Sequence, residues 1–370
     1  MVKKIIILTD QVSEIGGINS LIYLKSNYWV SVKSYQVDII TTEQKGKPSF
    51  YPLDKKVRLH DLSINYDRNT SYFKRKNLIR IFKNLVLLQK KISNIKPDFI
   101  IIANHIPVTF FFPLLITKAK FIKEFHFSKF HISKQKQSVF KKFEEKIQSK
   151  LDTLIVLSPE ERTFYKNDNI AVIPNPIDID IKDDLKFQGR KHIAMSAGRI
   201  AQVKRFDTLI DIWSLFVKNN TDWKLEIYGD GEEKYVKALN EKIKKLELSN
   251  FVEIKPSTNS LKTKMYENGL YLMTSEAECF PMVLLEAKSC GLPIISFNCP
   301  TGPRNILKNN FDGILVEDKN NKEFVDKLIE LTTNESLRIK LATNAYNTIN
   351  DYSLNKIMTL WDNQILNKKL

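Results

Sequence analysis

YLMTSEAECFPMVLLEAKSCGLP, residues 271–293, is the stretch that decides the fold of this chain. Its first five residues form a short apolar run typical of a buried strand, and an acidic loop follows at 276–279. Pro281 suits the first position of a helix, because its φ angle is already helical and its missing N–H would have no partner there. Gly291 is a natural end for that helix, and Pro293 prevents its continuation. The stretch therefore predicts a strand, a loop and a helix in direct succession.

The start of this helix is a predicted anion site. Unpaired amides and the positive end of the helix dipole meet there, so residues 280–283 suit an anion such as a diphosphate. These residues are Phe280, Pro281, Met282 and Val283. Two carboxylates flank the site, Glu278 before the helix and Glu286 in its second turn. Their spacing alone is weak evidence, because such pairs arise by chance in a chain rich in Glu, and a helix-start Glu is often only a solvated partner of the dipole.

The complete string resembles the nucleotide-sugar motif of retaining GT-B glycosyltransferases of family four. It runs from the strand through Glu278, an apolar turn and Glu286 to Gly291 and a further strand at 294–298. The resemblance implies that Glu286 binds the ribose hydroxyls of the donor and that the helix start binds its diphosphate. It also implies that Glu278 faces the donor sugar, in a catalytic position, and that transfer retains the anomeric configuration.

Length and composition are those of a two-domain globular protein. A chain of 370 residues has room for about two domains, and 43% hydrophobic residues suffice for packed cores. The apolar run in residues 1–8 is too short for a secretory signal, and residues 106–116 are too short to span a bilayer. We therefore expect a cytoplasmic protein, either dissolved or peripheral at the inner face of the cell membrane. The three cysteines are expected to be free thiols.

Strand and helix patterns alternate along the chain, which predicts an α/β fold with parallel sheets. The rigid sequence Pro174-Asn175-Pro176 marks a boundary between two doubly wound, Rossmann-like domains in tandem. We assign residues 1–173 to an acceptor-binding domain and residues 174–351 to a donor-binding domain. By the GT-B resemblance, residues 352–370 form a helix that crosses back to the first domain.

A second motif, SAGRIAQVKRFDTLI at residues 196–210, places two cations after a predicted strand. Arg199 can clamp phosphate oxygens with two hydrogen bonds, and Lys204 adds a point charge five residues later. Such cations would stabilise the charge of a departing diphosphate. Exposed surface cations with no ligand are the alternative. The same Gly-Arg-x4-Lys arrangement occurs at this place in family four.

Glycine-rich turns follow three predicted strands. Gly229 and Gly231 form a Gly-x-Gly turn that lacks the third glycine of a dinucleotide fingerprint, so a dehydrogenase is disfavoured. The family resemblance places this turn near the nucleotide. Gly16 and Gly17 precede a helical pattern and allow close approach of a ligand, or form only a tight turn; the family resemblance sets them at the donor diphosphate. Residues 301–303, Thr-Gly-Pro, resemble a loop bordering the donor pocket.

His126 is the candidate catalytic histidine, because it ends a predicted strand of the first domain. In related enzymes a histidine in this region lies beside the anomeric centre, although His105 and His131 are rivals and a lone histidine is usually structural. No metal site is predicted. The Asp178-Ile179-Asp180 string follows the linker rather than a strand, and Arg199 and Lys204 already neutralise a diphosphate, so we expect no cofactor.

The positive charge is concentrated in the first half. Residues 1–175 hold 30 Lys and Arg against 15 Asp and Glu, whereas the remaining residues hold 28 against 27. Residues 71–92 show a helical apolar period decorated with Lys and Arg, which suits either the surface of an anionic bilayer or a solvated helix packed on the sheet. An anionic partner of the first half is therefore expected, whether lipid, phosphorylated substrate or nucleic acid.

The predicted function is transfer of a sugar, with retention of its anomeric configuration, from a nucleotide diphosphate donor. We expect this donor to be a UDP-sugar. The acceptor would be a glycan or a lipid-linked glycan of surface polysaccharide biosynthesis, held by the basic first domain near an anionic membrane surface. A sugar-nucleotide epimerase with the same fold is the first alternative. A nucleic-acid-binding protein is the second; it explains the charge but not the glutamates of the near-neutral half, so no nucleic-acid partner is expected.

Overall fold

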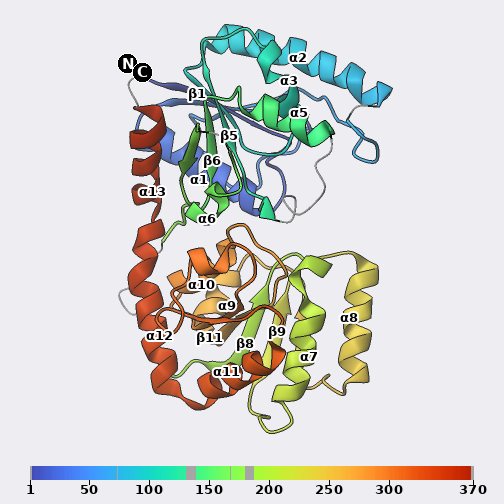
Figure 1. Ribbon diagram of the computed structural model, residues 1–370, viewed down its shortest axis with the longest axis vertical. Coiled ribbons are helices and arrows are strands. Elements are labelled where there is room, and N and C mark those ends of the chain that lie inside the picture. The colour runs from blue at the N-terminus through green and yellow to red at the C-terminus, as the bar shows by residue number, and fades with distance from the viewer. Residues whose placement is uncertain (1, 73, 131–138, 167, 180–186, 368–370) are drawn as a thin grey trace. The chain divides into compact units, whose positions relative to one another are not determined.

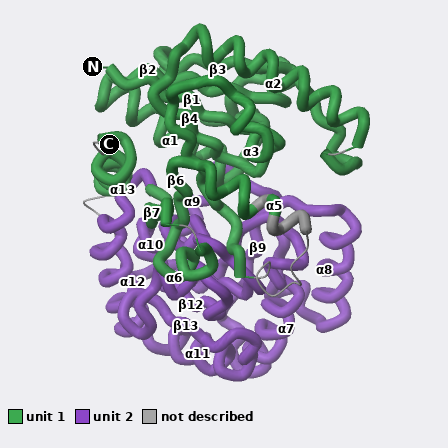
Figure 2. The backbone as a smooth tube through the Cα atoms, turned by 45° about the horizontal axis from the view of Figure 1, so that its top comes forward, with its two compact units in different colours: residues 1–176, 354–370 green, residues 177–353 purple. Residues whose placement is uncertain are grey.

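The computed structural model describes residues 2–72, 74–130, 139–166, 168–179 and 187–367. The chain divides into two compact units, shown in Figures 1 and 2: unit 1 is Met1–Pro176 with Leu354–Leu370, and unit 2 is Ile177–Ser353. The first division lies three residues beyond the predicted domain boundary. The last helix belongs to unit 1 although it follows unit 2 in sequence.

Unit 1 is built on a parallel sheet of seven strands in the order β3-β2-β1-β4-β5-β6-β7. The strands are β1 (Lys4–Thr9), β2 (Gln36–Thr41), β3 (Arg58–Asp61), β4 (Phe99–Ile102), β5 (Lys120–Glu124), β6 (Thr153–Val156) and β7 (Ile170–Val172). The helices are α1 (Gly17–Ser31), α2 (Arg75–Ile95), α3 (Val108–Phe111), α5 (Val139–Gln148), α6 (Pro159–Arg162) and α13 (Leu354–Trp361). Parallel strands need such crossover helices, as the alternating pattern predicted.

Alternate residues of the central strands enter two different cores of unit 1. Ile6 and Leu8 of β1 pack with Leu88 of α2 on one face of the sheet. Ile5 and Ile7 pack on the opposite face with residues of α1 and α13, among them Trp29 and Trp361. Because successive side chains of a strand point to opposite faces, the unbroken apolar run of β1 requires cover on both sides.

Unit 2 repeats this plan with six parallel strands in the order β10-β9-β8-β11-β12-β13. They are β8 (Lys191–Ala197), β9 (Lys224–Tyr228), β10 (Val252–Lys255), β11 (Asn268–Met273), β12 (Ile294–Phe297) and β13 (Ile314–Val316). The helices are α7 (Phe206–Phe216), α8 (Glu233–Lys245), α9 (Leu261–Glu267), α10 (Met282–Ser289), α11 (Asn321–Thr333) and α12 (Glu335–Thr348). Strand order reverses between β8 and β11, and ligands of such sheets bind at the carboxyl ends of the strands at this point.

Three local expectations need correction. The apolar pattern around residues 108–117 suggests one helix, but α3 stops at Phe111, and a 3-10 turn (Phe112–Leu114) follows because Pro113 cannot donate a helical hydrogen bond. Pro281 is the residue before the helix rather than its first residue, and α10 starts at Met282. The sequence reading also missed β13, whose three residues are too few to show a period.

Candidate active site

The helix start predicted from the sequence is present between β11 and α10. Pro281 caps the helix in an extended conformation, and Gly291 follows its end with a φ of 54°, in the left-handed region. Among the described residues, the amides of Phe280, Met282 and Val283 have no acceptor, whereas that of Leu284 bonds Pro281 O. Unpaired amides therefore remain at this helix end for a ligand.

The backbone of Glu278 is held by the loop at residues 300–302. Glu278 N donates to Pro300 O at 3.0 Å, and the amides of Thr301 and Gly302 donate to Glu278 O at 2.8 and 2.7 Å. A Cβ added to Gly302 would lie 2.4 Å from Pro281 Cδ, so only glycine fits there. The Thr-Gly-Pro loop thus lies against the helix start.

Lys204 and Glu278, predicted in separate motifs, form an ion pair. Lys204 Nζ lies 2.6 Å from Glu278 Oε1. The segment of Lys204 is tied to the end of β11, because Glu276 N donates to Val203 O at 2.8 Å and Thr274 Oγ1 donates to Arg205 O at 3.0 Å. The unit therefore places this lysine beside the carboxylate that precedes α10.

Arg199 occupies an exposed position at the carboxyl end of β8. Its neighbours Gly198 and Ile200 are fixed by hydrogen bonds to Tyr228 O and Asp230 O. Within the described part of the chain its guanidinium has no hydrogen bond or ion pair. The structure thus leaves Arg199 available to a ligand but does not bring it into contact with Lys204.

Gly229 and Gly231 have a packing role that sequence reasoning did not predict. A Cβ on Gly229 would lie 1.9 Å from Gly198 O, and one on Gly231 would lie 2.1 Å from Ile200 O. The turn after β9 therefore lies directly against the segment that carries Arg199. Both glycines are needed for this approach, whatever the turn binds.

Glu286 lies one turn inside α10 with a partly exposed side chain. Burial raises its pKa, and Lys262 opposes this shift. Within the described residues its carboxylate has no hydrogen-bond partner. A carboxylate in this state can gain free energy from hydroxyl donors of a ligand.

Tyr271 ties β11 to the end of β8, a link that the sequence did not reveal. Its hydroxyl donates to Ala197 O at 3.1 Å and accepts from Ala197 N at 3.2 Å. Burial raises its pKa, and the charges of Glu286 and Glu278 raise it further. The phenol thus fixes the backbone just before Gly198 while lying within electrostatic reach of both glutamates.

His126 lies in unit 1 just beyond β5 and its side chain is only 7% exposed. Its Nε2 is 3.9 Å from Glu124 Oε2, too far for a hydrogen bond, and neither ring nitrogen has a hydrogen-bond partner in the described residues. Burial lowers the pKa of His126. Lys25 of α1 pairs with the other oxygen of Glu124. The rival His105 is exposed, and His131 lies outside the described residues.

Gly16 and Gly17, at the start of α1, face open space. A Cβ at either position would meet no atom of the described residues within 4 Å. Packing within the protein therefore does not require these glycines, and their predicted place at the donor diphosphate stays a prediction.

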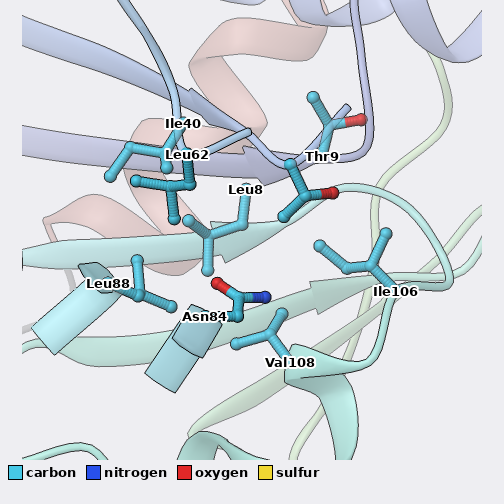
Figure 3. A pocket seen from close by; sticks show the side chains of 9 residues that line it. Leu8, Thr9, Ile40, Leu62, Asn84, Leu88, Ile106 and Val108 are labelled. Carbon is cyan, nitrogen blue, oxygen red and sulfur yellow. The ribbon is translucent and has the colours of Figure 1, made fainter. Parts of the chain in front are cut away.

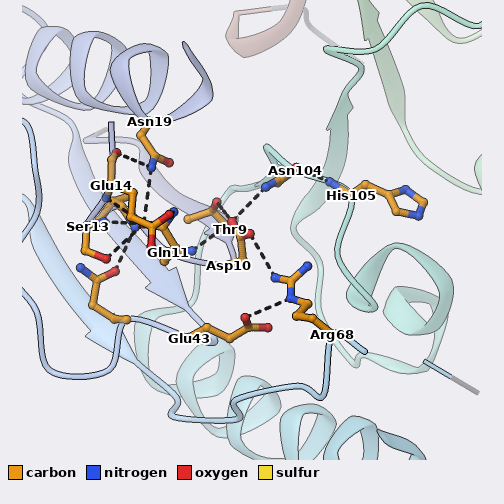
Figure 4. Close-up of polar contacts among 12 residues, drawn as sticks. Thr9, Asp10, Gln11, Ser13, Glu14, Asn19, Glu43, Arg68, Asn104 and His105 are labelled. Atoms are coloured by element: carbon orange, nitrogen blue, oxygen red, sulfur yellow. Dashed lines mark hydrogen bonds and ion pairs between the residues drawn. The ribbon is translucent and has the colours of Figure 1, made fainter. Parts of the chain in front are cut away.

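Polar side chains gather at the carboxyl ends of β1 and β4 in unit 1 (Figure 4). Arg68 reaches both Asp10 Oδ2, at 3.1 Å, and Glu43 Oε2, at 3.0 Å. Asn104 donates to Asp10 Oδ1 at 2.9 Å. Sequence reasoning missed this network, because its members lie up to 94 residues apart.

A largely apolar pocket lies at the same edge of this sheet (Figure 3). Thr9, Thr42 and Asn84 are its polar lining residues, and Leu8, Ile40, Leu62, Leu88, Ile106 and Val108 complete it. Asn84 Oδ1 and Thr42 Oγ1 are buried without a hydrogen-bond partner in the described residues.

The described residues contain no group of three or more His, Cys, Asp or Glu side chains that could hold a metal ion. Asp180 of the Asp-x-Asp string lies outside them. In the same part of the chain, no helix is both long and apolar enough to cross a membrane.

Models of known protein families match both halves of the chain. The family model "Glycosyl transferases group 1" matches residues 178–348, and the model "Glycosyltransferase Family 4" matches residues 15–181. The amylovoran biosynthesis glycosyltransferase AmsD of Erwinia amylovora is 30% identical over 379 aligned residues, covering 98% of this chain and 99% of AmsD.

Solved structures share the fold. HepE of Anabaena, solved in complex with UDP, has a TM-score of 0.77 at 15% identity and covers 99% of this chain and 100% of its own. The pneumococcal O-GlcNAc transferase GtfA, solved with UDP and GlcNAc, has a TM-score of 0.78 at 14% identity and covers 99% of both chains.

Proposed function

Because this chain belongs to the GT-B glycosyltransferases of family four, we propose that it moves a sugar from a UDP-sugar onto a glycan or lipid-linked glycan during polysaccharide biosynthesis. The biosynthetic setting is that of its relative AmsD, whose name assigns it to amylovoran biosynthesis. The choice of UDP is supported by the complexes of HepE and GtfA, which contain UDP.

The contact between Lys204 and Glu278 beside the start of α10 carries this proposal. Negative charge develops on the diphosphate as the sugar leaves, and a nearby ammonium and unpaired amides stabilise it. Lys204 supplies the ammonium, and Phe280, Met282 and Val283 supply amides. Arg199, exposed at the end of β8, adds a second cation.

The remaining residues of unit 2 are proposed to select the donor. Glu286 accepts hydrogen bonds from the ribose hydroxyls, and Glu278 orients the sugar and supports positive charge near its anomeric carbon. The ammonium of Lys204 lies 2.6 Å from Glu278 Oε1 and neutralises its charge. Diphosphate oxygens would share or replace this contact when the donor binds. Gly229 and Gly231 allow the turn after β9 to pack against the backbone of residues 198–200. This turn is proposed to lie near the nucleotide.

The roles of Gly16, Gly17 and His126 rest on the family resemblance. They belong to unit 1, and we propose that the glycines approach the diphosphate and that His126 lies beside the anomeric centre. Transfer would retain the anomeric configuration by attack on the face from which the diphosphate leaves, with the departing phosphate accepting the proton of the acceptor hydroxyl.

We propose that transfer needs no divalent metal, because Arg199, Lys204 and the helix dipole supply the positive charge that a metal would otherwise bring. Activity should then persist in excess EDTA. Loss of activity in EDTA that added Mg²⁺ or Mn²⁺ restores would overturn this part of the proposal.

The acceptor is proposed to be carried by a lipid, because the basic charge of the chain lies almost wholly in its first half. A sugar-nucleotide epimerase remains the alternative enzyme. Turnover of the donor alone, without acceptor, would reveal it. Salt-sensitive binding of duplex nucleic acid without affinity for UDP would instead favour the nucleic-acid-binding alternative.

The decisive experiment is a thermal-shift and calorimetric screen of UDP- and GDP-sugars. We expect stabilisation by UDP-sugars and a loss of UDP affinity of about 10- to 100-fold in the double variant Arg199→Met/Lys204→Met. The matched control is Lys218→Met, an exposed lysine just after α7. Unchanged UDP affinity in the double variant would refute the proposed diphosphate site.

A further inference from the structure

Helix α2 exposes apolar side chains that the core of unit 1 does not use. The exposed fractions are 65% for Ile79, 67% for Phe82 and 52% for Val86, and Leu78 beside them is 48% exposed. They follow one another at helical spacing and form a stripe. The inner face of the helix is a different stripe, on which Leu88 and Ile92 are buried. The helix is therefore apolar on two faces, and only one of them packs on the sheet.

A second segment continues the outer stripe. Leu114 is 66% exposed and Ile116 is 84% exposed, whereas Leu115 between them is buried in the core. Ile116 is held to α2 by two backbone hydrogen bonds with the side chain of Gln89: Nε2 donates to Ile116 O at 3.0 Å and Oε1 accepts from Ile116 N at 2.8 Å. Gln89 lies one turn beyond Val86, so Ile116 extends the same side of the helix.

These two segments concentrate apolar exposure. Leu78, Ile79, Phe82, Val86, Leu114 and Ile116 are six of the fifteen large apolar side chains that are exposed in the described residues. Single exposed apolar residues need no explanation, but a contiguous group marks a binding surface. We call these six residues the apolar ridge.

The charged residues around the apolar ridge are almost all basic. Residues 71–97 contain eight Lys and Arg and no Asp or Glu. Across residues 68–123 there are twelve Lys and Arg, and Asp98 is the only acidic residue. Lys76, Lys83 and Lys90 of this set are exposed on α2 itself.

We propose that the apolar ridge docks on an anionic lipid bilayer, with Phe82, Leu114 and Ile116 inserted among the lipids and the surrounding lysines on the headgroups. An amphipathic surface with aromatic and aliphatic side chains on one face and lysines beside it binds bilayers in this way. A soluble polyanion would satisfy the lysines but would leave the ridge in water. A second copy of the chain would bring two sets of like charges together, which opposes association.

This inference deepens the proposed function and rests on it, because docking serves catalysis only if the acceptor is lipid-linked as proposed. The inner face of α2 supplies Asn84 and Leu88 to the pocket at the carboxyl ends of β1 and β2 (Figure 3). The same helix thus presents its outer face to the lipid and its inner face to the edge of the sheet where ligands of such folds bind. A docked unit 1 would meet a lipid-linked acceptor at the membrane surface.

The test is flotation of the full-length protein with vesicles of phosphatidylcholine, alone or with about one third phosphatidylglycerol. We expect binding to the anionic vesicles only. The variants Phe82→Gln and Ile116→Gln should each weaken it by about tenfold or more, since each removes an inserted side chain. The matched control Leu215→Gln removes a side chain that is 47% exposed in unit 2 and should bind as the wild type does. Gln89→Ala should weaken binding to a lesser degree by releasing Ile116.

The outcomes separate docking from catalysis. Failure of the wild-type protein to prefer anionic vesicles would overturn the membrane proposal without affecting UDP binding, which is measured in the same samples. Equal binding by the wild type and both Gln variants, or full competition by a soluble anionic polymer, would show that charge alone holds the protein there and would overturn insertion. Circular dichroism and UDP affinity verify that each variant is folded.

Discussion

Glu286 lies in surroundings that oppose its charge. Burial raises the pKa of its carboxyl, so the folded protein binds this proton more tightly than the unfolded chain does. The stability gained from this is fully present below the unfolded pKa and is lost as the pH rises through the folded pKa. Above the folded pKa the ionised carboxylate is therefore unfavourable for folding, and hydroxyl donors of a ligand can offset this cost.

We predict that Glu286→Gln raises the melting temperature by roughly 2–4 °C at pH 7.5, with a smaller gain at pH 4.5. Its UDP affinity should fall at least about tenfold, because an amide is a weaker acceptor for ribose hydroxyls. Scanning fluorimetry at both pH values and calorimetric titration with UDP measure the two effects. A gain in melting temperature that does not depend on pH would contradict the explanation.

Lys25 and Glu124 form a buried ion pair, with side chains only 3% and 4% exposed. Burial by itself would raise the pKa of Glu124, but Lys25 and His126 lower it to about 2, from an ordinary value of 4.5. The stability from this group is therefore present above pH 4.5 and is lost as the pH falls toward 2.

Removal of one partner leaves the other charge buried and unpaired. We predict that Lys25→Met costs about 3–5 kcal/mol of unfolding free energy, and that the double variant Lys25→Met/Glu124→Leu recovers most of it. Urea denaturation of both variants at pH 7 measures the difference. A double variant as unstable as the single one would show that the lysine stabilises the fold through its packing on Trp361, whose ring centroid lies 5.0 Å from Nζ.

At the scale of elements, two glycine pairs that look alike in the sequence differ in what surrounds them. Gly229 and Gly231 lie against the backbone of residues 198–200. At Gly16 and Gly17, at the start of α1, no atom in the described part of the chain lies within 4 Å of the position of a Cβ. The first pair is required for the β8 and β9 loops to meet. The second is available for a ligand.

We predict that Gly229→Ala destabilises the protein by about 3 kcal/mol, because its Cβ would overlap Gly198 O. Gly17→Ala should leave the stability within about 1 kcal/mol of wild type, yet lower the rate of sugar transfer if donor phosphates approach this loop. Denaturation and steady-state kinetics on both variants separate the two cases. Full activity of Gly17→Ala would remove that glycine from the proposed donor site.

At the scale of the whole molecule, the C-terminal helix completes the unit in which the chain begins. Trp361 of α13 is 2% exposed and meets Trp29 of α1 edge to face, with ring centroids 5.6 Å apart. Asp362 pairs with Lys33 at 2.7 Å, and Lys3 Nζ donates to Leu366 O at 2.7 Å. The core of unit 1 is therefore complete only when residues 354–366 pack against it.

We predict that Trp361→Ala lowers the free energy of unfolding by about 3–5 kcal/mol and that unit 1 is the part destabilised. Limited proteolysis followed by mass spectrometry should find the first new cuts within Met1–Pro176, with Ile177–Ser353 still protected. Trp361→Phe is the milder control. First cuts inside unit 2 would contradict the assignment of this helix to the core of unit 1.

Much of the plan was predictable because its signals are local. The GT-B fold, the alternation of strands and helices, and the family are confirmed by the comparisons with known proteins. The helix after β11 begins and ends where Pro281 and Gly291 indicate, to within two residues. Such signals lie within a few neighbouring residues, so they can be recognised without knowledge of the rest of the chain.

The contacts that shape the candidate site could not be predicted in this way. Lys204 and Glu278 are 74 residues apart, and Tyr271 bonds a backbone group 74 residues away. The network of Asp10, Arg68 and Asn104 joins three loops of unit 1. These residues meet because parallel strands place segments that are distant in sequence side by side, which no local pattern records.

The sequence by itself determined most of the order of strands and helices, the boundaries of α10 to within two residues and the charge difference between the halves, because propensity and composition are properties of short segments. Only the tertiary structure decided that Lys204 neutralises Glu278, that Gly229 is a packing residue and that the outer face of α2 is uncovered. Those facts depend on which segments become neighbours in space, and side-chain exposure is defined only once the chain has folded.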